Sequence, residues 1–330
     1  MVLLGFLVCI AIAIVRLKDL FAVVMLSGIY GLLSASFFVT LDAVDVAFTE
    51  AAVGAGIATL LMLVTVTMTG RYEHSAHHNS IWALAVVLVT GVLLIYGTLD
   101  MPYFGSVDAP AQLHVAPRYI NNSMQEIGVP NIVTSVLASY RGYDTLGEVV
   151  VIFTAGVGVL ALLSAVHRPE KDDGIVSVNV SMHEKYLILR VVTKILIPFI
   201  LLFALYVQFH GDYGPGGGFQ AGVIFAAAII LYSMLFGMST ARRVISQPLI
   251  QLLSAIGVLV YGSVGVVSIL NGGNFLDYNL LSDDPVAGQH LGILLVELGI
   301  GCTVTSVMVI IFFNFAGRTE DHMRNERKSA

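Results

Sequence analysis

Gln289–Phe315 has the sequence QHLGILLVELGIGCTVTSVMVIIFFNF, an apolar run in which Glu297 is the one residue with a full charge. A membrane-spanning helix needs about 20 mostly apolar residues, and this run is long enough. A charged side chain in the hydrocarbon region costs at least about 2.5 kcal/mol, so such residues normally face water or a partner. The run therefore predicts a transmembrane helix that carries a functional carboxylate.

The rest of the chain has the same character. It is 57% hydrophobic and 12% charged, with a mean hydropathy of +0.88, whereas soluble domains carry about 25% charged residues. No series of short segments alternates with a period of two, as a β-barrel would require. We expect an all-α polytopic membrane protein with about nine transmembrane helices, over 1–15, 20–41, 46–69, 81–98, 146–166, 186–209, 219–238, 249–270 and 289–315.

Loop charges predict the orientation of these helices. Basic residues concentrate in alternate loops and in the C-terminal tail, while the opposite loops are rich in aspartate. Positive charge stays in the cytoplasm, so we expect an external N-terminus and a cytoplasmic C-terminus. The net charge of -6 is spread along the chain, and this distribution argues against nucleic acid as a partner.

Two long connections suggest where the chain divides. The external connection over 99–145 contains several prolines and one expected short helix at 131–140. The connection over 168–185 is polar, charged and cytoplasmic, and we expect it to be a linker between domains. The two cysteines, Cys9 and Cys302, lie in separate apolar runs, so we expect neither a disulfide framework nor a zinc or iron–sulfur site.

Ionisable residues inside the helices are the candidate functional residues. Glu297 and Lys194 each lie about 12 Å inside their spans, and Glu50 and Glu148 lie within about 6 Å of their outer helix ends. The alternatives are ordinary ones: Glu50 and Glu148 as solvated interface residues, Lys194 as a snorkelling side chain, and Glu297 in a structural ion pair.

Small residues accompany two of these carboxylates. Gly54 follows Glu50 by one helical turn, Gly301 follows Glu297 by one turn, and His290 precedes Glu297 by two turns. Small residues on the same face let another helix or a chain of water approach the carboxylate. The carboxylate could then take a proton or coordinate a hard cation. The histidines of a cytoplasmic loop, His74, His77 and His78, resemble a metal cluster only weakly, and we expect no metal site there.

The stretch from His210 to Gly222, HGDYGPGGGFQAG, is unusually rich in glycine and leads into a helix. Glycine permits backbone conformations closed to other residues, and the free amides of a helix N-terminus favour anions. The stretch is not a P-loop, since no Gly-Lys-Ser/Thr follows. Physical reasoning favours a tight turn packed against its neighbours over a ligand site.

The stretch also carries a family resemblance. Its segment Pro215, Gly216, Gly217, Gly218, Phe219, Gln220 and Gly222 resembles the MnhB family, the B subunit of multisubunit Mrp-type sodium/proton antiporters, over 181–315. The segment DVAFTEAAVGAG at 45–56 resembles the three-helix domain at the C-terminal end of the Mrp A subunit. The segment YRGYDTLGE at 140–148 resembles the two-helix unit that follows it there. Both units have relatives in membrane-bound hydrogenases and complex I.

The resemblance implies a division into a three-helix module at 1–79, a two-helix module at 80–167, the linker, and a four-helix MnhB-like domain with a charged tail at 186–330. It implies that Glu50 and Glu148 lie along a cation path. Glu297, His290 and Lys194 are added from their depth and neighbours alone.

We therefore expect a subunit of a secondary transporter in a bacterial inner membrane, exchanging cytoplasmic Na⁺ for external H⁺. By resemblance its partners are other antiporter subunits, including a large A-type chain. No catalytic residue and no cofactor is expected. Two alternatives stay open: a membrane subunit of a redox-driven pump such as a membrane-bound hydrogenase, and a structural scaffold that never touches the ion.

Overall fold

The computed structural model describes residues 1–73, 80–164 and 187–329, with side chains up to residue 317. Within that part, eight helices are long and apolar enough to cross a membrane, and α1 (Val2–Arg16) is a shorter apolar helix. The predicted all-α polytopic fold is confirmed. The expected linker at 168–185 and the histidines 74, 77 and 78 lie outside the described residues.

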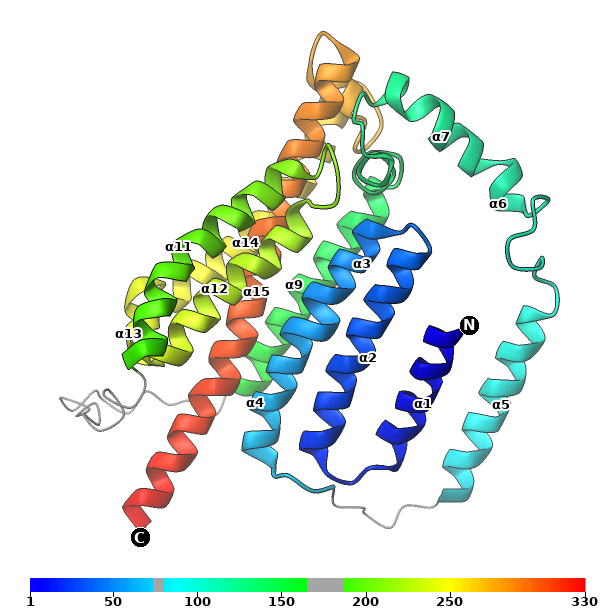
Figure 1. Cartoon of the computed structure of the whole chain (residues 1–330). Helices are drawn as coiled ribbons and strands as arrows, with labels where there is room; N and C mark the ends of the chain where they lie inside the picture. Colours follow the sequence, from blue (N-terminus) through cyan, green and yellow to red (C-terminus); the bar gives the residue numbers. More distant parts are fainter. Residues whose placement is uncertain (74–79, 165–186, 330) are drawn as a thin grey trace.

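The N-terminal helices α1, α2 and α3–α4 lie side by side in one row in Figure 1. α2 (Leu20–Thr40) begins at Asp19, whose carboxylate accepts hydrogen bonds from the Phe21 and Ala22 amides. The next span is one 26-residue helix, Val44–Thr69, made of α3 (Val44–Glu50), the π-helical η1 (Ala51–Ala58) and α4 (Thr59–Thr69). Arg71, just after this span, forms an ion pair with Asp19 at 2.8 Å.

The middle of the chain contributes α5 (Ser80–Thr98) and α9 (Gly142–Ser164). α5 stands apart from the other helices in Figure 1, and none of its apolar residues is buried. The connection from α5 to α9, expected to be external, folds into α6 (Pro110–Leu113), α7 (Val115–Glu126), α8 (Ile132–Thr134) and the π-helical η2 (Ser135–Tyr140). The short helix expected at 131–140 is confirmed. α7 was missed because its sequence, VAPRYINNSMQE, is too polar to be recognised as a membrane element.

The C-terminal helices form the most tightly packed part of the molecule. They are α11 (Leu187–His210), α12 (Gly218–Phe236), α13 (Met238–Val244), α14 (Gln247–Leu270), the 3₁₀ turn η3 (Tyr278–Leu281) and α15 (Pro285–Ser329). α15 packs against α9, α12 and α14. The charged C-terminal tail continues this helix.

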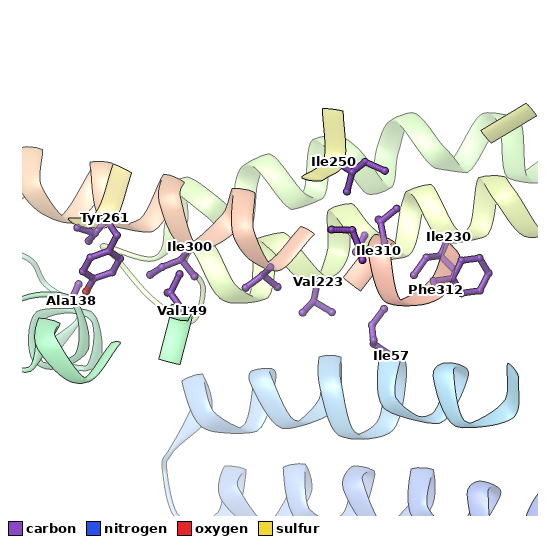
Figure 2. Close-up of a cluster of buried hydrophobic side chains, with 14 of the residues drawn as sticks. Ile57, Ala138, Val149, Val223, Ile230, Ile250, Tyr261, Ile300, Ile310 and Phe312 are labelled. Carbon is purple, nitrogen blue, oxygen red and sulfur yellow. The ribbon is translucent and has the colours of Figure 1, made fainter. Parts of the chain in front are cut away.

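The apolar core lies along α15, between the N-terminal row and the C-terminal helices (Figure 2). Ile57 of η1 points toward side chains of α12 and α15 there. α14 and α15 approach closely where Gly257 faces Gly299: a Cβ added to Gly299 would lie 2.7 Å from the Gly257 carbonyl oxygen. This close approach keeps α15 at the centre of the bundle, where its polar residues are shielded from lipid.

Candidate functional site

The glycine-rich stretch forms a turn that folds back under the end of α11. The Gly217 amide donates a hydrogen bond to the carbonyl of Val207, 3.0 Å away. Gly217 has φ 109° and ψ -177°, a conformation that is essentially restricted to glycine. The predicted tight turn is therefore present, and it directs the first turn of α12 toward α15.

Glu297 of α15 lies against this turn. A Cβ added to Gly217 would lie 2.9 Å from Oε1 of Glu297, and one added to Gly211 would lie 3.2 Å from Oε2. The backbone N–H of Gly218 faces the carboxylate as a hydrogen-bond donor. Free amides and the dipole at a helix N-terminus favour an anion. The absence of side chains at Gly211 and Gly217 thus makes room for a carboxylate that the α12 N-terminus can stabilise.

Two further carboxylates interact with Glu297. Asp212, in the turn, and Asp45, at the start of α3, are both close enough for electrostatic repulsion. Asp212 is also 3.7 Å from Nδ1 of His290, and both side chains are partly exposed at 32% and 42%. His290 and Asp212 thus form a partly exposed pair next to the partly buried Glu297.

Asn131 of the external connection fixes the turn. Its side-chain amide donates to the carbonyls of Gly211 (3.1 Å) and Gly214 (3.0 Å). The same amide is 3.4 Å from Oδ1 of Asp45, which also accepts from the Gly216 amide at 3.3 Å. Segments from all three parts of the chain, N-terminal, external and C-terminal, thus meet at the start of α12.

Glu50 lies at the end of α3, beside Gly54. A Cβ on Gly54 would lie 2.6 Å from Oε1 of Glu50, so the two share a helix face as the sequence predicted. The backbone of Gly54 packs against Gly31 of α2, where an added Cβ would lie 2.7 Å away. The neighbour of Glu50, Thr49, accepts a 2.8 Å hydrogen bond from Gln220 of α12. The residue before Glu50 is therefore bonded to the first turn of α12, the same end of α12 that Glu297 faces.

Glu148 of α9 has an exposed side chain. Both Glu148 and Glu297 lie within electrostatic range of the buried hydroxyl of Tyr261. That hydroxyl donates to the carbonyl of Gly142 at 2.7 Å, which anchors α9 to α14.

Lys194 lies elsewhere. Its Nζ is 5.4 Å from the ring centroid of Phe236, the last residue of α12, and its side chain is exposed. Glu297 of α15 faces Gly218, the first residue of α12, which has 19 residues. Lys194 and Glu297 are therefore separated by about 27 Å along α12. Among the described residues, Lys194 is not part of the Glu297 cluster, and the position of Lys194 fits the snorkelling alternative.

The polar residues found only in the structure are Asp45, Asp212 and Asn131. The first two had visible signals: Asp45 opens the motif that contains Glu50, and Asp212 lies inside the glycine-rich stretch. Both were assigned to external loops by charge alone. In the described part of the chain, no three His, Cys, Asp or Glu side chains converge closely enough to hold a metal ion.

A polar cluster joins α7 to η2. The hydroxyl of Tyr140 donates to the carboxylate of Glu126, and Arg118 lies 3.4 Å from the same carboxylate. The Tyr140 hydrogen bond lowers the pKa of Glu126. Burial, and then the bond to Glu126, raises the pKa of Tyr140 to about 12. The cluster therefore keeps Glu126 ionised and α7 attached to η2 at neutral pH.

The C-terminal part of the chain matches known proteins most clearly. Residues 188–310 match the family model described as "Domain related to MnhB subunit of Na+/H+ antiporter". "Putative antiporter subunit mnhB2" of Staphylococcus aureus (strain Newman) is 36% identical over 140 residues, which are 41% of this chain and 98% of that relative. The chain belongs to the MnhB family. The same protein of Staphylococcus aureus strain USA300 is likewise 36% identical to this chain over 140 residues.

The rest of this MnhB-family chain matches other membrane proteins. Residues 5–71 match the MbhD family model and residues 83–180 match the MbhE family model, both of which describe subunits of MBH. The whole fold is similar to a chain in "Structure of Mrp complex from Dietzia sp. DQ12-45-1b", with a TM-score of 0.76 and 26% identity. The match covers 96% of this chain and 34% of that one, so this chain spans about a third of its length. The resemblance seen in the sequence is thereby confirmed.

Proposed function

We propose that the chain is a subunit of a multisubunit Mrp-type antiporter that exchanges cytoplasmic Na⁺ for external H⁺, and that its carboxylates line part of the ion path. The observation that carries the proposal is the setting of Glu297. It is a carboxylate inside the span Pro285–Gly317, beside glycines that leave its oxygens accessible to a helix N-terminus. No lysine or arginine pairs with it among the described residues.

An unpaired carboxylate in a membrane span is costly, and residues of this kind usually mark a functional site. Here the cost is reduced by the α12 N-terminus and increased by Asp212 and Asp45. A group balanced in this way can change between ionised and neutral, or bind and release a cation. We infer a route from the outside past His290 and Asp212 to Glu297, and laterally past the start of α12 to Glu50.

The remaining assignments follow from the same proposal. The N-terminus is external and the C-terminus cytoplasmic, in a bacterial inner membrane. The modules at 1–79 and 80–167 take the place of the C-terminal end of an A-type subunit, and a separate large A-type chain is a partner. Glu148, exposed on α9, faces such a partner and continues the path there. Lys194 has no place on this route.

The test is Na⁺-dependent proton exchange in inverted vesicles, normalised to the amount of assembled complex. Glu297→Gln removes the titratable charge and keeps the size of the side chain. We expect exchange to fall at least about tenfold, the effect of a change of about 1.4 kcal/mol. Asp283→Asn, on an exposed external residue, is the matched control and should have no effect. Normal exchange by Glu297→Gln across a range of pH and Na⁺ would remove Glu297 from the path.

A redox-driven pump is the second candidate, favoured by the matches of residues 5–71 and 83–180 to the MbhD and MbhE family models. The proteins that co-purify with the chain in mild detergent distinguish the two. Large multi-helix partners without cysteine-rich chains support the antiporter. Cysteine-rich partners with iron–sulfur clusters support the pump.

A further inference from the structure

Gln208 of α11 has an unusual environment. Its side chain is 6% exposed, and its amide nitrogen Nε2 is buried without a hydrogen-bond partner in the described part of the chain. A buried donor without a partner is destabilising. Two other glutamines are buried to the same degree, Gln220 at 7% and Gln289 at 5%.

Those two glutamines have partners. Gln220 donates to Thr49, while Gln289 accepts from Ser139 and donates to Asn279. The donor of Gln208 is therefore an exception within the same bundle. It has almost no accessible surface, so bulk solvent does not satisfy it.

The amide of Gln208 lies one helical turn from Glu297. A Cβ on Gly301 would lie 2.7 Å from Oε1 of Gln208, so this amide covers the bare backbone of Gly301. Gly301 follows Glu297 by four residues and therefore shares its face of α15. Because Gly301 has no side chain, no side-chain atom at that position stands between the amide and the Glu297 side chain. The Glu297 carboxylate is a flexible acceptor on that face of α15.

We propose that the Glu297 carboxylate has a second, inner position in which it accepts a hydrogen bond from Nε2 of Gln208. In the outer position, seen here, it faces Gly217 and the amide of Gly218, near Asp212. Moving to the inner position exchanges the Gly218 amide for the Gln208 amide and increases the separation from Asp212. The carboxylate then has a donor at both ends of its movement, and it carries its proton or cation one step inward. This inference rests on the proposed role of Glu297 in transport.

Replacing Gln208 by methionine separates this role from a structural one. Methionine has a similar shape but no donor, and removing an unpartnered buried donor in this way is neutral or stabilising. A structural role for Gln208 therefore predicts normal or higher thermal stability together with normal exchange. The proposal predicts normal or higher stability together with exchange reduced at least about tenfold, since hydrogen bonds to charged groups are strong.

Gln289→Met is the matched control, because it removes an amide of equal burial that has both partners. It should lower the thermal stability of the assembled complex. Gly301→Ala places a methyl group against Gln208 and should reduce exchange, whereas Gly262→Ala, whose Cβ would meet nothing within 4 Å, should not.

The direct readout is cryo-electron microscopy of the assembled complex at acidic and alkaline pH. We expect density for the Glu297 carboxylate within hydrogen-bond distance of Gln208 in one of the two maps. Normal exchange by Gln208→Met, while Glu297→Gln is inactive, would overturn this inference and leave the proposed function intact. Normal exchange by both variants would overturn the proposed function as well. A Glu297 carboxylate fixed at Gly217 in both maps would also overturn the two-position inference.

Discussion

Gly217→Ala is the sharpest test of the idea that the glycine-rich turn exists to hold Glu297. All three of the nearest atoms that the new Cβ would meet belong to the Glu297 carboxyl group, at 2.9, 3.1 and 3.3 Å. Ordinary contacts at a Cβ are several tenths of an ångström longer. The carboxylate has to move away from the α12 N-terminus, and its contact with the Gly218 amide is weakened.

Two effects contribute to the magnitude. The backbone conformation of Gly217 disfavours any residue with a Cβ and costs about 1–3 kcal/mol. Loss of a hydrogen bond to a charged group costs about 1.5–3 kcal/mol more. The first acts on folding and the second on the carboxylate that takes part in transport. A change of about 1.4 kcal/mol corresponds to a factor of ten, so we expect exchange to fall at least about tenfold in the fraction that folds.

Gly237→Ala is the matched control for the backbone effect. Gly237 has φ 89° and ψ 150°, a similar glycine-only conformation at the other end of α12, but its Cβ would meet nothing within 4 Å. Both variants should lower the melting temperature of the assembled complex by similar amounts. Only Gly217→Ala should lose Na⁺-dependent exchange per assembled complex. Equal exchange by the two variants would refute a functional role of the turn and leave it as a packing device.

Three further predictions concern other parts of the chain. Glu50→Gln should assemble normally and lose most exchange, while Glu50→Asp keeps part of it; a packing role predicts that glutamine is tolerated. In intact cells, and with both native cysteines replaced, an impermeant thiol reagent should label a cysteine at Ser106 but not one at Ser329; the reverse would invert the topology. The pKa of Glu126 is lowered in the folded chain, so the stability it provides is present at neutral pH and is lost as the pH falls below about 4. The rate of amide hydrogen–deuterium exchange in α7 should rise as the pH falls through that range, and Glu126→Gln should remove this pH dependence. A rate in α7 that does not change with pH would disprove the attachment of α7 through Tyr140.

Local sequence was sufficient to predict the helices of the membrane region and the tight turn before α12. Apolar length decides whether a segment crosses a bilayer, and glycine content decides which backbone conformations are open to it. The same local reasoning placed Glu50 beside Gly54, because residues four apart share a helix face. It also selected Glu297, because the cost of a charge rises with its depth in the hydrocarbon, and depth can be counted along the sequence.

Contacts between distant segments were beyond such reasoning. Asp45 and Asp212 carry no local sign that they meet Glu297, since their approach depends on how α3 and α15 pack around α12. Lys194 shows the converse: its depth resembles that of Glu297, yet packing places it at the far end of α12 against Phe236. Depth along a helix does not fix which face of the helix meets a neighbour.

The sequence by itself determined that this chain is a bundle of membrane helices, since the hydrocarbon region leaves few alternatives to a long apolar segment. Through its glycine-rich motif it also determined the family. Only the tertiary structure decided which polar groups share a site, and that the donor of Gln208 is buried without a partner in the described part of the chain, one turn from Glu297. The physical reason is that hydrophobicity is a property of a segment, whereas a hydrogen bond or a repulsion between carboxylates depends on distances of a few ångströms between segments.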